Sequence, residues 1–371
     1  MQGSARVRHN VLILGASYGS LLGTKLLMAG YRVSLVCTRT TAELISTEGT
    51  RVRFPVTFNG GHVEIASRDL PGSLVAETPD DVDVQRYDLV VLAMQEPQLA
   101  APSVKALMAR IASSRKPCLA IMNMPPLAYL QRITGLATEC LRESYTDANV
   151  WEGFDSTVMT LASPDAQAFR LPDGPKNMLE VGLPTNFKAA CFDDANATRL
   201  LRQLAGDIEA ARGTADGQQI EIPVKLKVHD SIFVPLAKWP MLITGNYRCI
   251  RPNGMVSIKE AVHENILASR QLYQWVCELC MALGAAPDDL VPFDKYAKAA
   301  ASLGKPSSAA RAVAAGVEHI ERVDSLVQQI ALQRGVHSEA VDHIVRIVDE
   351  RLCENRARRS REEPVRAALA A

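Results

Sequence analysis

The chain has no long apolar run, no excess of either charge and no export signal. Its first residues, Met1–Asn10, lack the apolar stretch of a signal peptide. No run of about 18 apolar residues, the length that spans a membrane, occurs anywhere. Lysine plus arginine (41) balances aspartate plus glutamate (41), so no overall field attracts nucleic acid or an anionic membrane. We therefore expect a cytoplasmic protein with neither kind of partner.

Clustered cysteines and metal-ligand spacings are also absent. The 8 cysteines are scattered along the chain, which is typical of a reduced, cytosolic protein. Cys277 and Cys280 have redox or zinc spacing, but they lie in a helical segment without a second ligand pair. The histidines show no ligand spacing either. We interpret the two cysteines as residues of a helix face and predict no metal site.

At 371 residues, the chain is long enough for two domains, which we place at residues 1–225 and 226–371. In the first, short aliphatic runs alternate with helical stretches such as Ser20–Ala29, as in a parallel sheet buried on both faces. The predicted strands are Val11–Leu14, Val33–Val36, Leu89–Ala93 and Leu119–Met122. Residues 50–86 predict an irregular excursion with short strands, and residues 150–190 predict an antiparallel extension of the sheet.

From residue 226 onward, apolar residues recur at helical spacing and no strand-like run separates them. One stripe runs from Val262 to Leu283, a second from Val313 to Ile330, and a third from Val341 to Leu352. Residues 354–371 carry many charges and predict a frayed helix or a tail. The fold class is therefore α/β: a Rossmann-like parallel-sheet domain followed by an all-α domain, whose stripes are compatible with a homodimer.

A glycine-rich turn joins the first predicted strand to the first predicted helix. The segment Gly15-Ala-Ser-Tyr-Gly19-Ser-Leu-Leu-Gly23 places backbone N–H groups and the positive end of a helix where a pyrophosphate would bind. Gly15 would form the turn, Gly19 or Ser20 would allow close approach, and Gly23 would let the helix pack on the sheet. Ser17 stands where the usual motif has its second glycine, and a purely structural turn is the alternative.

The end of the second predicted strand indicates which dinucleotide would bind. An NAD enzyme is expected to have an acidic residue there, but none occurs from Arg32 to Ala42. Thr38 and Arg39 could bind a 2′-phosphate by a hydrogen bond and an ion pair. The sequence therefore favours NADPH over NADH, with a solvated surface arginine as the alternative.

No tyrosine is followed by lysine at the Tyr-x-x-x-Lys spacing, which excludes the short-chain dehydrogenases. A different candidate lies in the helical half. Lys238 stands in an apolar segment and Asn246 follows about two helical turns later, on one face. Such a lysine either extends its ammonium group to water or serves a site.

At these segments the chain resembles the ketopantoate reductase (2-dehydropantoate 2-reductase) family over nearly its whole length. The corresponding segments are GASYGSLLG at 15–23, TR at 38–39, DLVVLAMQEPQ at 88–98, AIMNMPP at 120–126, AKWPMLITGN at 237–246 and 305–335. The resemblance implies a Rossmann domain, a helical domain and NADPH-dependent reduction of a 2-keto acid.

The resemblance also implies roles for single residues. Lys238 would be the catalytic general acid, with Asn246, Ser308 (or Ser307) and His319 binding the substrate. Combined with the glycine turn, the expected cofactor residues are Gly15, Ala16, Ser17, Tyr18, Gly19, Thr38, Arg39, Gln95 and Asn123. The chain departs from the family pattern in that Gln95 replaces a lysine, Met124 a glycine, Leu242 an asparagine and His319 an acidic residue.

These departures leave three hypotheses for the function. The first is a reductase of ketopantoate or a related 2-keto acid, a small-molecule substrate. The second is an enzyme of the same build acting on a larger ketone, an imine (opine-type chemistry) or a specialised metabolite. The third is a nucleotide-binding protein without turnover, which Lys238 and Asn246 argue against.

Overall fold

The computed structural model describes residues 9–55, 61–171, 173–215 and 217–370, and the chain divides into two compact units. The first comprises the residues up to 94, together with 98–132 and 149–235. The second comprises 95–97, 133–148 and the residues from 236 onward. Residues 226–235, beyond the boundary that we predict at residue 225, belong to the first unit.

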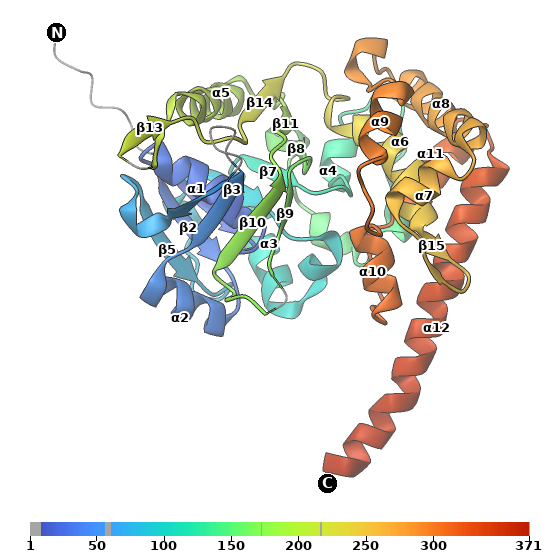
Figure 1. The fold of residues 1–371 in the computed structure, drawn as a ribbon, viewed down its shortest axis with the longest axis horizontal. Coiled ribbons are helices and arrows are strands. Elements are labelled where there is room, and N and C mark those ends of the chain that lie inside the picture. The colour runs from blue at the N-terminus through green and yellow to red at the C-terminus, as the bar shows by residue number, and fades with distance from the viewer. Residues whose placement is uncertain (1–8, 56–60, 172, 216, 371) are drawn as a thin grey trace. The chain divides into compact units, whose positions relative to one another are not determined.

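The first unit is built on an eight-stranded sheet (Figure 1). In sheet order its strands are β14 (Leu226–His229), β11 (Phe187–Ala190), β8 (Met159–Ser163), β7 (Cys118–Ile121), β6 (Leu89–Leu92), β1 (Asn10–Leu14), β2 (Arg32–Val36) and β5 (Ser73–Glu77). The four predicted strands are confirmed as β1, β2, β6 and β7. Every residue of β6 and β7 is buried, which explains why these runs are continuously apolar.

Strand direction follows the prediction only in part. Strands β5, β2, β1, β6, β7 and β8 are parallel, β11 is antiparallel to β8, and β14 is parallel to β11. The antiparallel extension predicted for residues 150–190 is therefore correct for β11. It is wrong for β8, which runs parallel to β7 with Met159 opposite Cys118. It is also wrong for β10 (Met178–Leu183), which leaves this sheet.

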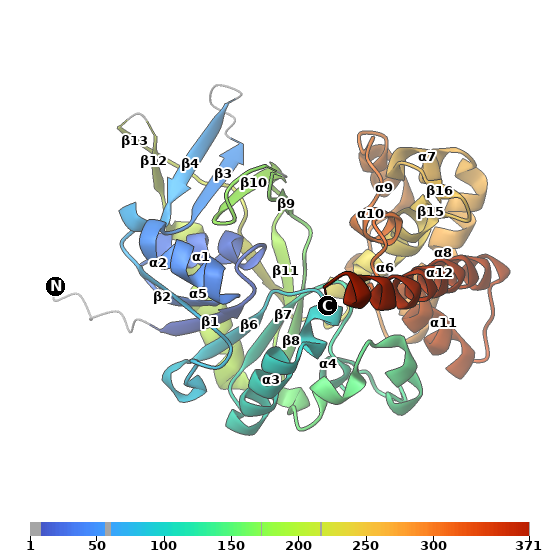
Figure 2. The ribbon, with the colours of Figure 1, turned by 90° about the horizontal axis from the view of Figure 1, so that it is seen from below.

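A second, four-stranded sheet has the order β4 (His62–Ala66), β3 (Arg51–Pro55), β10 and β9 (Gln167–Phe169), as Figure 2 shows. Strand β10 pairs parallel with β3 and antiparallel with β9. The excursion predicted at residues 50–86 thus contributes β3 and β4 to this sheet, while β5 forms the edge of the main sheet. A short hairpin, β12 (Gly213–Ala215) and β13 (Gln218–Ile220), completes the strands of the first unit.

Helices cover the main sheet. Helix α1 (Gly19–Met28) and α5 (Ala195–Ala210) lie side by side on one face and share its apolar core, and the other helices are α2 (Arg39–Glu48), α3 (Pro102–Ser114) and α4 (Leu127–Leu130). Lys25 of α1 is buried, and its Nζ donates to the carbonyl oxygen of Ile222 at 2.7 Å. Burial lowers the pKa of this lysine to about 8.

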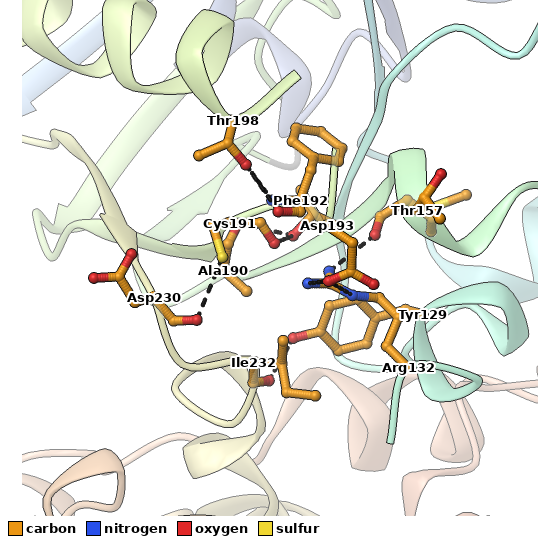
Figure 3. A network of polar contacts seen from close by, with 12 residues as sticks. Tyr129, Arg132, Thr157, Ala190, Cys191, Phe192, Asp193, Thr198, Asp230 and Ile232 are labelled. Atoms are coloured by element: carbon orange, nitrogen blue, oxygen red, sulfur yellow. Dashed lines mark hydrogen bonds and ion pairs between the residues drawn. The ribbon is translucent and has the colours of Figure 1, made fainter. Parts of the chain in front are cut away.

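A polar network fastens the end of the main sheet where β8 begins and β11 and β14 end (Figure 3). The guanidinium of Arg132 binds Asp193 at 2.7 Å and the carbonyl oxygen of Met159 at 3.1 Å. The hydroxyl of Tyr129 donates to the carbonyl oxygen of Ile232. Arg132 is the last residue of one segment of the first unit. Ile232 lies shortly before Pro235, the last residue of another. The network therefore fixes both segments against the sheet.

The second unit is helical, which confirms the predicted fold class. Its helices are α6 (Trp239–Met241), a π-helical turn (Leu242–Asn246), α7 (Ile258–His263), α8 (Ile266–Ala282), α9 (Phe293–Ala300), α10 (Ser308–Ala314), α11 (Val323–Gln333) and α12 (Glu339–Ala370). A hairpin of two short strands, β15 (Ile250–Arg251) and β16 (Gly254–Met255), interrupts them. Residues 354–370 continue α12 as helix. No helix in the described parts of the chain has the length and apolar character needed to cross a bilayer.

Two of the predicted helical stripes are each divided between two helices. The stripe from Val262 to Leu283 breaks before α8, because the side chain of Asn265 caps that helix by accepting from the N–H of Ala268 at 3.0 Å. The stripe from Val313 to Ile330 breaks after α10, because Gly316 adopts φ +86° and ends the helix. A single helix over the stripe from Val313 to Ile330 is therefore wrong.

Candidate functional site

The turn after β1 requires a glycine. Gly15 has φ +106°, and its N–H donates to the carbonyl oxygen of Val36 at 2.9 Å. A Cβ at this position would lie 2.7 Å from the carbonyl oxygen of Ala93, which follows β6. A Cβ at Gly19 would lie 2.6 Å from the side chain of Ile13, whereas one at Gly23 would find only ordinary contacts from 3.6 Å. The close approach of the turn and the start of α1 to β1 and to Ala93 thus depends on Gly15 and Gly19. Gly23 is not needed for it.

This turn has the geometry of a site for a diphosphate. Strand β1 lies between β2 and β6, and α1 begins directly above the carboxyl end of β1. The first N–H groups of a helix have no partner within the helix, and they carry its positive end. Within the turn Ala16 is buried and Ser17 is exposed, while the hydroxyl of Ser20 donates to the carbonyl oxygen of Ala16 at 2.5 Å. The residues present fit a dinucleotide at this turn.

Tyr18 fixes the outer side of the turn. Its hydroxyl donates to the carbonyl oxygen of Ala166 at 2.7 Å, and its ring packs edge-on against Phe187 with 5.8 Å between the ring centroids. Burial raises the pKa of Tyr18 well above its usual value, so the phenol remains a neutral hydrogen-bond donor. The structure therefore gives Tyr18 a role in holding a neighbouring segment next to the glycine turn.

Thr38 and Arg39 lie just past the end of β2, and both are exposed. Thr38 precedes α2, and its hydroxyl contacts that of Thr41 at 3.0 Å. Arg39 is the first residue of α2 and forms no ion pair with any residue that the structure describes. A free guanidinium at this edge is available to an anion.

The other two expected cofactor residues follow the neighbouring strands. Asn123 is half-buried just after β7, at the same edge of the sheet as Gly15. Gln95 is exposed shortly after β6, within the short stretch 95–97 that belongs to the second unit. The structure thus gathers the glycine turn, Thr38, Arg39 and Asn123 at one edge of the first unit.

In the second unit, Lys238 and Asn246 are both half-buried and lie on one irregular helical segment. A 3₁₀ turn, Pro235–Lys238, leads into α6, and the π-helical turn follows. Eight residues of a regular α-helix advance about 80° beyond two full turns. A π turn contains more residues per turn, so it reduces the angular offset between Lys238 and Asn246.

Side chains from neighbouring helices stabilise the π turn. The hydroxyl of Tyr296 donates to the carbonyl oxygen of Met241 at 3.1 Å. It can do so because residue 245 is glycine, at which a Cβ would lie 2.0 Å from the Tyr296 oxygen. This hydrogen bond joins α9 to the residue that precedes the π turn.

The structure also brings the start of α10 next to Asn246. Ser307 is buried, and its hydroxyl donates to the carbonyl oxygen of Asn246 at 2.7 Å while accepting from the N–H of Ala310 at 3.1 Å. Ser307 therefore caps α10 and positions Asn246. Ser308, the next residue, is exposed and remains the serine available to a substrate.

His319 lies outside any helix, in the segment between α10 and α11, and it is exposed. The helical stripe predicted from Val313 to Ile330 would place His319 on a helix, which is wrong, because α10 ends before Gly316. The role of His319 in substrate binding stays a prediction.

A buried carboxyl group, Glu96, was not predicted from the sequence. Its two oxygens accept from the N–H and the hydroxyl of Thr146, both at 2.9 Å, within the second unit. Burial raises its pKa to about 7, assisted by the charge of Glu321, although the hydrogen bonds from Thr146 oppose this. Nothing in the local sequence indicates that a glutamate between Gln95 and Pro97 is 1% exposed.

No family model matches the chain, and a comparison with curated proteins also found no match. Solved structures do match. A putative ketopantoate reductase from Ralstonia solanacearum MolK2 is 15% identical, with 94% of this chain and 99% of that chain covered and a TM-score of 0.64. A 2-dehydropantoate 2-reductase from Methylococcus capsulatus is 15% identical, with 94% of this chain and 97% of that chain covered and a TM-score of 0.63.

A D-mandelate dehydrogenase in a ternary structure with NADH and anilino(oxo)acetate is 14% identical, covers 94% of this chain and 99% of that chain, and has a TM-score of 0.62. At these identities the likeness concerns the fold. The chain therefore has the two-part fold of ketopantoate reductases and D-mandelate dehydrogenase.

The glycine turn generates a prediction about stability. Gly15→Ala should lower the free energy of unfolding by about 2 kcal/mol, because φ +106° and the Ala93 carbonyl oxygen both disfavour a Cβ. Gly23→Ala is the matched control and should raise it by about 0.5–1 kcal/mol, because alanine is the better residue inside a helix. Urea unfolding measures both, and equal effects of the two substitutions would contradict the close packing at Gly15.

The raised pKa of Glu96 predicts a dependence of stability on pH. The folded protein binds this proton more tightly than the unfolded chain does, so stability should fall as the pH rises from the ordinary value of 4.5 to about 7. Glu96→Gln should therefore stabilise the protein by about 2–3 kcal/mol at pH 8 and much less at pH 5.

Unfolding by urea at the two pH values measures this difference. Glu139→Gln, at a side chain in the same unit that is 84% exposed, is the control and should have little effect at either pH. An equal gain from Glu96→Gln at pH 5 and pH 8 would show that the Glu96 carboxyl group does not titrate in this range.

Proposed function

We propose that the protein is an oxidoreductase that uses a nicotinamide dinucleotide to transfer hydride to the carbonyl carbon of a 2-keto acid or related ketone. The observation that carries this proposal is the glycine turn. Gly15 and Gly19 bring α1 against β1 and the residue after β6, which leaves the start of the helix facing the position of a diphosphate. The fold shared with ketopantoate reductases and D-mandelate dehydrogenase supports it.

We propose NADPH as the preferred cofactor. Thr38 and Arg39 are exposed at the end of β2, and the stretch from Arg32 to Ala42 has no carboxylate to bind the ribose hydroxyls. The matching D-mandelate dehydrogenase structure contains NADH, so the choice of cofactor rests on these residues rather than on the fold.

The side chains of the second unit supply the acid chemistry of the proposal. A bound nicotinamide ring provides the hydride. Negative charge then develops on the carbonyl oxygen of the substrate, and the Lys238 ammonium would stabilise this charge and donate its proton. Asn246 would orient the same oxygen or a neighbouring hydroxyl group through its amide. Ser308 would bind the carboxylate or a hydroxyl group of the substrate.

The departures from the ketopantoate reductase pattern bear on the substrate. Leu242 is buried in the second unit and offers no polar group, and His319 is exposed. Because these positions differ from the ketopantoate reductase pattern, we propose the class of 2-keto acids and not ketopantoate alone. Ketopantoate is the first compound to test and aryl 2-keto acids are the second. Turnover of an imine instead, or binding of nucleotide without turnover of any compound, would be separate outcomes when these compounds are assayed.

Titration of the purified protein with NADPH and with NADH, followed by cofactor fluorescence, tests the first step. We expect NADPH to bind at least about tenfold more tightly, because a charge-assisted hydrogen bond to a phosphate contributes about 1.5–3 kcal/mol. Equal binding of the two would refute the NADPH preference alone. Binding of neither would refute the reductase proposal.

Lys238→Met tests the second step. With a keto acid that the wild-type protein turns over, kcat should fall by about 10²–10⁴-fold while the Kd for NADPH stays unchanged, because only the proton donor is removed. Lys298→Met, at an exposed lysine of α9, is the matched control and should retain full activity. Full turnover by Lys238→Met with NADPH bound would remove Lys238 from the mechanism.

A further inference from the structure

Strand β9 leads away from the glycine turn. The hydroxyl of Tyr18 holds the carbonyl oxygen of Ala166 at 2.7 Å, and β9 begins at the next residue, Gln167. Arg170 follows the end of β9, and its positive charge opposes the effect of the burial that raises the pKa of Cys37, the residue that follows β2. The segment 166–170 therefore extends from the turn after β1 to the end of the neighbouring strand β2.

The charge of Arg170 has no counterion in the protein. Arg170 is half-buried, and burial lowers its pKa, yet it forms neither an ion pair nor a hydrogen bond through its side chain with any described residue. The neighbouring Cys37 thiol is neutral, because burial raises its pKa to about 11. A guanidinium that is partly removed from water without an anion is unfavourable unless a ligand supplies one.

Other arginines of the first unit show how the protein normally treats such a group. Arg51, Arg53 and Arg132 are also half-buried, and each pairs with a carboxylate: Arg51 and Arg53 with Glu64, and Arg132 with Asp193. Arg170 is the half-buried arginine of this unit's described residues that lacks such a pair. Arg170 is therefore distinguished from the other half-buried arginines of the first unit by its place in the fold.

Two carboxylates in this region, Glu77 and Asp165, already have partners. Glu77, whose carbonyl oxygen accepts from the N–H of Cys37, receives a hydrogen bond on its carboxylate from the hydroxyl of Tyr87 at 2.6 Å. Asp165, which lies near Tyr18, pairs with Lys188 at 3.3 Å. The end of β2 thus has two guanidiniums, Arg39 and Arg170, neither of which forms an ion pair with a carboxylate of the described residues.

We propose that Arg170 determines cofactor specificity by binding the 2′-phosphate of NADPH together with Arg39. Arg39 approaches from the start of α2 and Arg170 from the end of β9. Thr38, the residue before Arg39, contributes a hydroxyl group. This inference rests on the proposed use of NADPH, and it adds a second cation that the local sequence around β2 does not contain.

The test compares Arg170→Met with the wild-type protein in titrations with four probes: NADPH, NADH, 2′,5′-ADP and 5′-ADP. We expect the Kd values for NADPH and 2′,5′-ADP to rise by about 10-fold or more, since a lost charge-assisted hydrogen bond has that effect. The Kd values for NADH and 5′-ADP, which have no 2′-phosphate, should change less than about twofold. Arg53→Met, on the same small sheet, removes an equal charge and should leave all four values unchanged.

Each other outcome has a distinct meaning. If Arg170→Met weakens all four probes equally while its unfolding curve matches the wild type, Arg170 does not recognise the 2′-phosphate and the inference fails. If the wild-type protein prefers NADPH and Arg170→Met keeps that preference, the inference fails but the proposed function stands. If the wild-type protein binds none of the probes, the proposed function fails and the inference fails with it.

Discussion

The close approach of α1 to strands β1 and β6 is the constraint on which the candidate cofactor site depends. Gly15 can turn toward the helix because its φ is +106° and because no Cβ separates it from the carbonyl oxygen of Ala93. Gly19 then packs directly on Ile13. A side chain at either position would push the helix away from the sheet. The start of α1 would then no longer face the edge where β1, β2 and β7 end.

The distribution of positive charge in the first unit follows a simple electrostatic rule. Partly buried guanidiniums pair with carboxylates where they hold the structure together, as Arg132 does with Asp193 beside the end of β11. At the opposite edge, Arg39 and Arg170 have no such partners. The proposal that this edge binds the 2′-phosphate of a cofactor rests on these two guanidiniums without carboxylate partners.

The second unit obtains its candidate site from irregular helix. Short turns and a π turn carry Lys238 and Asn246, and hydrogen bonds from Tyr296 and Ser307 hold this geometry. The site residues therefore depend on packing between helices that are distant in sequence. Such a segment can place two polar side chains on one face that a regular helix would separate.

The sequence by itself determined the elements whose causes are local. The aliphatic runs became β1, β2, β6 and β7, and Gly15 formed the turn, since a continuous apolar run and a glycine carry their own conformational signals. The caps at Asn265 and Gly316 carry similar signals, which a reading based on apolar periodicity alone overlooks. Only the tertiary structure decided the direction of β8, the transfer of β10 to a second sheet, the burial of Glu96 and the approach of Arg170 to Cys37. These features depend on contacts between segments far apart in the chain, whose free energy no local pattern of residues records.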